Sequence, residues 1–250
     1  MRRNTDRGRL IVTDKNQVEI NRLVADLQNS EPRTVQAAIA QISRIGPADS
    51  GKVREAIFVV AALLQPCSPG AKSQGSNAEL RMRACWALGQ IGYKAPQDIL
   101  PAITPLAQCL TDEDAAVRAN AVWALGRIGR VNPQAIQPIL PDMMGSAGDP
   151  EVQVRSNFLS ASENIATDQP EWLLPYLPIL IRLLDDEDTR SIRRQAPELF
   201  RIIAKKRPEM LGEAAGKLES MLDDPDEIVR LNASRALSAI QNNPQPDRSR

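Results

Sequence analysis

The chain has 250 residues, of which 42% are hydrophobic, 25% charged and 3% aromatic, and these values are ordinary for a globular protein apart from the scarcity of aromatics. Its 31 basic residues balance its 31 acidic residues, whereas a nucleic-acid binder usually shows a basic excess. It contains no histidine, which excludes Ser–His and Cys–His catalysis and removes the commonest metal ligand.

The first residues are polar and rich in arginine, and they lack the apolar core of a secretory signal. We therefore expect residues 1–15 to form a disordered basic tail, and residues 242–250 to form a second disordered tail. No run of 18 apolar residues is present, so no membrane span is expected. The three cysteines, Cys67, Cys85 and Cys109, are too few for a disulfide framework, which favours reduced thiols and a cytoplasmic location.

An internal repeat dominates the rest of the chain. The segment Leu80-Arg-Met-Arg-Ala-Cys-Trp-Ala-Leu-Gly-Gln-Ile-Gly92 returns as Val117-Arg-Ala-Asn-Ala-Val-Trp-Ala-Leu-Gly-Arg-Ile-Gly129, and weaker copies follow at spacings of 37 or 38 residues. One arginine occupies the same position in five copies. These arginines are Arg81, Arg118, Arg155, Arg193 and Arg230.

Each copy is predicted to contain two helices. From Val117 onward, apolar residues recur at the spacing of one helix face, and the preceding segment, residues 99–110, is also apolar at helical spacing. Pro101 and Pro105 predict a late start or a kink in that first helix. The acidic link, residues 111–114, supplies a cap for the second helix.

A single helix pair cannot bury its apolar stripe, so neighbouring pairs must stack. The sequence predicts an all-α fold, a right-handed α-solenoid of about six helix pairs over residues 16–241. Residues 65–78 interrupt the period with a Gly-, Ser- and Pro-rich insert, predicted to be flexible. The insert is either a tolerated loop or part of a binding face.

The acidic turn, the Val-Arg pair and the Ala-Leu-Gly-x-Ile-Gly ending, as in Val117 to Gly129, resemble the HEAT repeat. More narrowly, they are similar to the short HEAT-like repeats of phycobilin lyase subunits. The resemblance covers about residues 16–241, and it implies an α-solenoid far more strongly than any one function. Residues 160–166 and 195–197 depart from the pattern, the latter by placing Pro197 within a second helix.

The resemblance also implies that turn acids and the repeated arginines bind one another in a structural ladder within or between repeats. Ionised hydrogen bonds of this kind are strong and would hold the turns together. The predicted ladder comprises Asp112, Arg118, Asp149, Arg155, Arg193, Asp224 and Arg230.

In a HEAT solenoid the second helices line the concave surface, so polar and aromatic positions on them are candidates for binding a protein. Arginine and tryptophan are enriched at binding hot spots. The predicted protein-binding residues are Arg83, Trp86, Gln90, Asn120, Trp123, Arg127 and Asn157. The alternative for Trp86 and Trp123 is packing between repeats.

No pattern for a phosphate-binding loop or a nucleophile–base pair occurs. The acidic runs at residues 185–188 and 223–226 lack the ligand spacing of a calcium loop. We therefore predict no catalytic residue, cofactor or metal, and expect a non-catalytic scaffold or adaptor that binds a protein partner. Two alternatives stay open: lyase- or chaperone-like handling of a cofactor-bearing protein, implied by the resemblance, and binding of nucleic acid. Nothing in the sequence fixes the oligomeric state.

Overall fold

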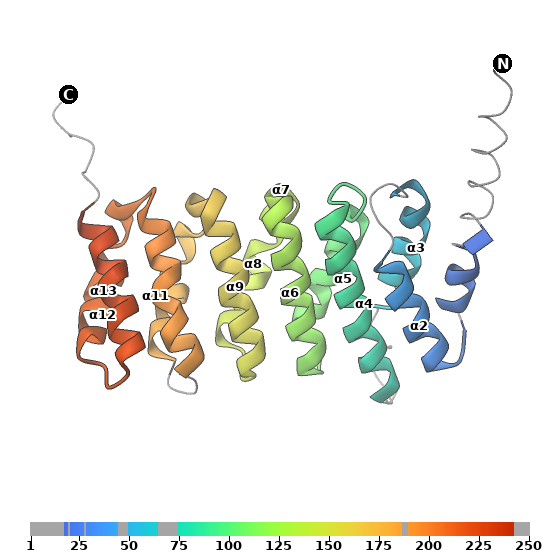
Figure 1. Cartoon of the computed structure of the whole chain (residues 1–250), viewed down its shortest axis with the longest axis horizontal. Helices are drawn as coiled ribbons and strands as arrows, with labels where there is room; N and C mark the ends of the chain where they lie inside the picture. The colour runs from blue at the N-terminus through green and yellow to red at the C-terminus, as the bar shows by residue number, and fades with distance from the viewer. Residues whose placement is uncertain are drawn as a thin grey trace, which may run out of the picture. The chain divides into compact units, whose positions relative to one another are not determined.

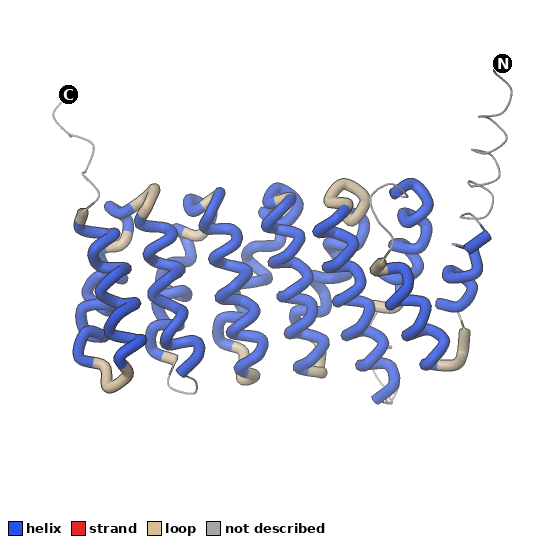
Figure 2. Tube along the Cα trace, in the orientation of Figure 1, coloured by secondary structure: helices blue, strands red, loops and turns tan. Residues whose placement is uncertain are grey.

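The structure is a computed structural model that describes residues 18–19, 21–27, 29–44, 50–64, 75–186 and 190–242. The predicted tails, except Asn242, and residues 65–74 of the predicted insert lie outside these ranges. Every regular element in the described part of the chain is a helix, and no strand occurs there (Figure 2).

The chain divides into two compact units, Met1–Ala124 and Leu125–Arg250. The boundary falls within one helix, α6 (Ala115–Val131). Each unit is described by itself.

Unit 1 consists of helix pairs in two layers. Its principal helices are α2 (Pro32–Ile42), α3 (Ser50–Ala62), α4 (Gly75–Lys94), α5 (Ile103–Gln108) and the first part of α6. The second helices α2 and α4 pack on each other, and the first helix α3 packs on both α4 and α5 (Figure 1). This arrangement buries residues such as Leu88 and Leu106 completely.

The helix α4 begins inside the segment that was predicted as a flexible insert. Residues 75–78 are helical, which corrects the expected end of that insert. The reason is local: serine and asparagine favour helix starts, and the alanine and glutamate that follow are good helix formers.

Prolines shorten the first helices. In the third pair, a 3₁₀ turn over Leu100–Ala102 precedes α5, and a second one over Cys109–Thr111 follows it. Proline has no N–H to donate and fixes its own φ, so Pro101 fits the first turn but interrupts a regular α-helix. The late start expected from the sequence is therefore present.

Unit 2 repeats this design. Its α-helices after α6 are α7 (Pro133–Ile136), α8 (Leu140–Met143), α9 (Val152–Asp168), α10 (Leu177–Ile181), α11 (Arg190–Ala204), α12 (Gly212–Ser220) and α13 (Glu227–Gln241). Short 3₁₀ stretches join them at Gln137–Ile139, Met144–Gly148, Pro170–Trp172, Leu174–Tyr176, Arg182–Asp185, Pro208–Met210 and Met221–Asp223.

The second helices of unit 2 lie in sequence order, with α11 packed between α9 and α13 (Figure 1). The first helices form the other layer, in which α10 packs on α12. Phe158 and Phe200 are completely buried in this unit. The predicted fold class, all-helical and built of stacked helix pairs, is thus confirmed within each unit.

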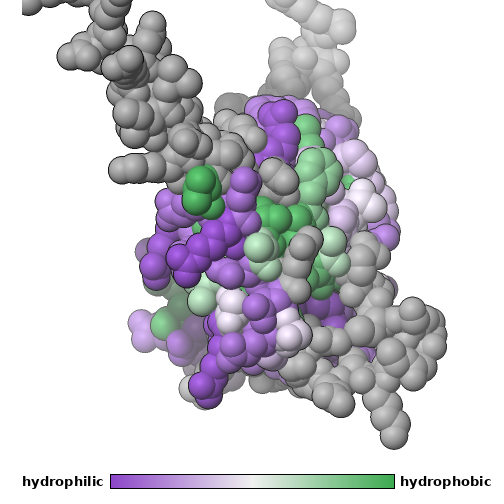
Figure 3. All heavy atoms as spheres, turned by 90° about the vertical axis from the view of Figure 1, so that its right-hand side faces the viewer, coloured by the Kyte–Doolittle hydropathy of each residue, from purple (hydrophilic) through white to green (hydrophobic). Residues whose placement is uncertain are grey.

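The surface of unit 1 carries both apolar and hydrophilic side chains. Among its described residues, the large apolar side chains of Val18 and Phe58 are exposed, at 64% and 55%. The view onto the end of this unit nearest the N-terminus shows an apolar area bordered by hydrophilic side chains (Figure 3).

Candidate protein-binding face

The repeated arginine binds the turn of the following repeat. Arg81 donates from Nε and Nη2 to the two carboxylate oxygens of Asp112, at 2.7 and 2.9 Å. Both side chains are buried, and the hydrogen bonds from Arg81 to Asp112 raise the pKa of the guanidinium above its ordinary value. The pair therefore ties the second helix pair to the third.

The same relationship recurs in unit 2. Arg155 donates to Asp186 at 2.7 and 3.3 Å, and both side chains are again buried. Arg193 lies 2.5 Å from the carboxylate of Asp224. These carboxylates already bind the guanidinium groups of Arg81, Arg155 and Arg193, so these three arginines hold neighbouring repeats together.

Three of the repeated arginines also donate from Nη1 to backbone carbonyls of the turn that precedes their own helix. Arg118 Nη1 donates to the carbonyl oxygens of Asp112 and Glu113, at 2.8 and 3.2 Å. Arg155 does the same to Asp149, at 2.7 Å, and Arg230 does so to Asp224, at 2.6 Å. All seven residues of the predicted ladder thus lie at the turns between first and second helices.

The ladder predicted from the sequence left out two residues that take part in these ion pairs, Arg81 and Asp186. Asp186 was missed because its repeat is one residue longer, so it does not lie six residues before the next arginine. The spacing that identifies it is the 31 residues from arginine to acid, which Arg81–Asp112 and Arg155–Asp186 share.

In unit 1, α4 presents three of the predicted binding residues in one row. Arg83, Trp86 and Gln90 are spaced three and four residues apart, so they lie one above another on the helix. Trp86 is 39% exposed, and Arg83 binds Glu79 on the same helix at 2.6 Å. This row is one accessible part of the second-helix face, by which we mean the solvent side of the second helices.

Trp123 is placed differently from Trp86. Its side chain is half-buried, and its ring lies so close to Gly89 of α4 that a Cβ atom added there would meet ring atom Cζ3 at 2.8 Å. Trp123 therefore packs between repeats, which was the alternative to a binding role for this residue. The amide of Asn120 donates to the carbonyl of Ala116 in its own helix, at 2.8 Å.

The two other predicted binding residues belong to unit 2. Arg127 on α6 is half-buried. Asn157 on α9 accepts a hydrogen bond from Gln153, at 2.9 Å, on the same helix.

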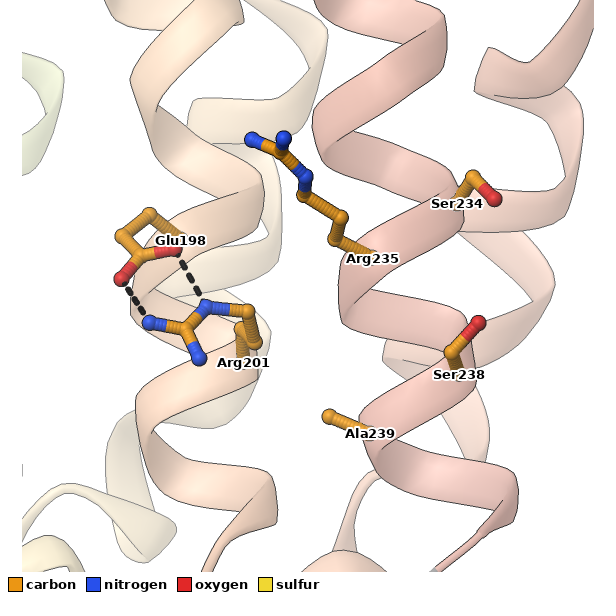
Figure 4. Close-up of a pocket in the computed structure, with 6 residues that line it drawn as sticks. All are labelled: Glu198, Arg201, Ser234, Arg235, Ser238 and Ala239. Atoms are coloured by element: carbon orange, nitrogen blue, oxygen red, sulfur yellow. Dashed lines mark hydrogen bonds and ion pairs between the residues drawn. The ribbon is translucent and has the colours of Figure 1, made fainter.

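Unit 2 also carries a charged hollow that sequence analysis did not identify. It has a volume of about 480 Å³ and is lined by Glu198 and Arg201 of α11 and by Ser234, Arg235, Ser238 and Ala239 of α13 (Figure 4). Glu198 and Arg235 occupy the repeat position that holds Trp86 and Trp123 in unit 1. That change of residue type along one column is the signal that could have found it.

A partly buried carboxyl lies near this hollow. Loss of hydration raises the pKa of Glu163 on α9 to about 7, and the charge of Glu198 contributes to the rise. In unit 1 the same repeat position is Gly89, where the next helix approaches closely. At this repeat position α9 therefore carries a carboxyl group that can bind a proton, where α4 carries a glycine that lets the next helix approach closely.

The cysteines that the structure describes are inaccessible. Cys85 and Cys109 are both free and buried. The contact with Cys109 and the burial raise the pKa of the Cys85 thiol well above its ordinary value. A buried protonated thiol is a poor nucleophile, so Cys85 does not offer reactive chemistry.

Comparison with family models decides the family. The model described as HEAT repeats matches residues 70–157 and 106–201, and these overlapping matches together cover more than half of the chain. The chain belongs to the HEAT repeat family. A comparison with curated protein sequences gives no match.

Several solved structures that are similar to this HEAT repeat chain are designed or engineered proteins. A designed armadillo repeat protein in complex with the peptide (KR)4 is 25% identical, with a TM-score of 0.70 over 89% of this chain and 99% of that one. Computationally designed armadillo repeat proteins for modular peptide recognition are 25% identical, with a TM-score of 0.65 over 87% and 98%. An engineered protein with 21% identity and a TM-score of 0.68, over 90% and 99%, shows the fold alone.

The described HEAT repeats contain no cluster of three or more potential metal ligands. None of the helices in the described ranges is both long enough and apolar enough to cross a membrane.

Proposed function

We propose that this HEAT repeat chain is a non-catalytic adaptor that binds a segment of a protein partner on its second-helix face. The observation that carries the proposal is the exposed indole of Trp86, which stands between Arg83 and Gln90 on the solvent side of α4. A large aromatic group that is exposed beside polar groups combines apolar contact area with hydrogen bonding, as binding hot spots do.

Comparison with designed proteins supports a peptide as the kind of ligand. Of the similar solved structures, one is a complex with the peptide (KR)4, and another was designed for modular peptide recognition. The proposal places the row on α4 at the centre of the contact, with Asn120 of the same unit on its flank. Binding roles for Trp123, Arg127 and Asn157 stay predictions from the sequence.

The test is selection of peptides from a displayed random library on the whole chain. Selected peptides are then titrated against Trp86→Ala, which removes the exposed indole. Loss of a hot-spot aromatic should weaken the binding of these peptides by about tenfold or more, while the helix content measured by circular dichroism stays unchanged.

Phe58→Ala is the matched control, because Phe58 is also an exposed aromatic residue but lies on a first helix. Its binding should equal that of the wild type. A library that yields no peptide, or peptides that respond to Phe58→Ala and not to Trp86→Ala, would contradict the proposed face.

The narrower resemblance to phycobilin lyase repeats stays a prediction, and a coloured ligand that purifies with the chain would support it. The cytoplasmic location also stays a prediction. Nucleic-acid binding is the weaker alternative, because the charges of the whole chain balance.

A further inference from the structure

The hollow between α11 and α13 contains an arginine that makes no ion pair with any residue the structure describes. Arg235 is exposed on α13, and its guanidinium extends toward α11, beside the Glu198–Arg201 pair (Figure 4). A guanidinium carries five N–H donors in a planar fork that matches a carboxylate. Arg235 therefore brings an uncommitted positive charge into the hollow.

The one acidic side chain that lines the hollow is already neutralised. Arg201 donates to both carboxylate oxygens of Glu198, at 2.6 and 2.5 Å. The hydroxyls of Ser234 and Ser238 make no hydrogen bond with the described residues and can donate. The groups left to a ligand are thus mainly donors beside a positive charge.

We propose that this hollow binds the carboxylate of an acidic side chain in a partner peptide, with Arg235 as the main donor and the two serine hydroxyls beside it. The inference rests on the proposed function, because it names the chemistry of one contact on the second-helix face. A hollow of about 480 Å³ is large enough for a side chain together with the adjoining peptide backbone.

A carboxylate fits this site better than the backbone of a nucleic acid. Nucleic-acid affinity comes from many phosphate contacts along a basic track. Arg235 and Arg201 are the only basic residues that line the described hollow, and Arg201 is bound to Glu198. One free guanidinium suits one carboxylate, which it can bind through two parallel hydrogen bonds.

The nearby Glu163 carboxyl sets the conditions for a test. Its pKa of about 7, raised by burial and by Glu198, leaves it mostly protonated at about pH 6, where it repels an anion least. Binding is therefore measured at about pH 6 and low salt, because exposed charges are screened as salt rises.

The experiment titrates the whole chain into a fluorescein-labelled peptide of alternating glutamate and serine and follows the anisotropy. We expect Arg235→Ala to weaken binding by about tenfold, because a hydrogen-bonded charge is lost, and Arg235→Lys to restore part of it. Arg182→Ala is the matched control, since Arg182 is an exposed arginine on the first-helix layer of the same unit and its loss changes the net charge equally.

Several results would overturn the inference. One is an absence of binding by the acidic peptide, and another is equal weakening by Arg235→Ala and Arg182→Ala. Tighter binding of a Lys-Arg peptide that Glu198→Gln abolishes would also overturn it, as would tighter binding of single-stranded DNA that Arg235→Ala abolishes. Library peptides that depend on Trp86 while the acidic peptide fails to bind would leave the proposed function standing and remove this inference alone. An acidic peptide that depends on Arg235 while no library peptide depends on Trp86 would support this inference and remove the contact on α4.

Discussion

Arg81 on α4 and Asp112 in the turn before α6 form a two-point ion pair, with Nε–O and Nη2–O distances of 2.7 and 2.9 Å. Their side chains are only 4% and 5% exposed. Such a pair stabilises chiefly because neither charge can be left alone in a buried site. It is also specific, since the fork of the guanidinium fixes where the next turn must lie.

Removal of Arg81 alone should therefore be costly. We expect Arg81→Ala to lower the free energy of unfolding by about 3 kcal/mol, because Asp112 keeps a buried and unpaired charge. Urea denaturation followed by circular dichroism measures the change. The matched control is Arg83→Ala, whose exposed pair with Glu79 should be worth less than about 1 kcal/mol.

Replacement of both partners separates the charge penalty from the packing. Arg81→Met combined with Asp112→Leu should be less destabilising than Arg81→Ala, since no buried charge remains. A double variant at least as unstable as the single one would show that the pair stabilises through its own attraction.

The Glu163 carboxyl predicts a pH dependence of stability. Its pKa is about 7 in the folded chain, against an ordinary value of 4.5, so the folded state holds the proton more tightly. Its contribution favours folding fully below about pH 4.5 and is lost as the pH rises through about 7. Because the side chain is partly exposed, we expect a loss of about 2 kcal/mol across that window.

Glu163→Gln should remove this loss. Relative to wild type, the variant should gain stability between about pH 5 and about pH 8, as measured by urea denaturation at both values. Glu219→Gln, at an exposed position on α12, is the control and should follow the wild type. A stability difference between Glu163→Gln and wild type that does not change with pH would refute the assignment.

Close helix approach at two glycines predicts a steric cost. A Cβ at Gly89 would lie 2.8 Å from Ala124 Cα, and one at Gly126 would lie 2.6 Å from Ala161 Cβ. Gly89→Ala and Gly126→Ala should each destabilise by about 1–3 kcal/mol, since the helices must move apart. Thermal unfolding measures the effect.

Gly216 offers the opposite outcome within a helix. Apart from its own helix backbone and its chain neighbours, no atom lies within 4 Å of a Cβ built there, and the residue is inside α12. Gly216→Ala should stabilise by about 0.5–1 kcal/mol, because alanine is the better helix former. Destabilisation by all three alanine variants would argue against close packing as the cause.

Two asparagines at one repeat position should differ in their effect on stability. The Asn232 amide donates to the carbonyl of Arg194 in the neighbouring helix, at 2.8 Å, whereas the Asn120 amide bonds within its own helix. Asn232→Ala should cost about 1 kcal/mol because it breaks a partly buried link between helices, and Asn120→Ala should cost less than about 0.5 kcal/mol. Equal costs, measured by chemical denaturation, would mean that the link between helices contributes nothing.

The amino-acid sequence alone determined the helix pairs, their period and the residues that terminate them. Apolar residues at helical spacing, prolines in first helices and acidic turns act within one repeat, so they can be read without knowing the neighbours. The sequence also picked out the arginine column, because one contact is made again in each repeat. It could not identify Asp186 as the partner of Arg155, because that contact crosses to the next repeat, which is one residue longer.

The tertiary structure decided what each residue at a shared repeat position does. Trp86 and Trp123 are equivalent in sequence, yet one is exposed and the other packs against Gly89. The hollow beside Arg235 likewise exists only where α11 and α13 stand side by side. Exposure and pairing depend on the side chains of the adjacent helix, which lie some 37 residues away in the sequence, and only the folded chain brings them together.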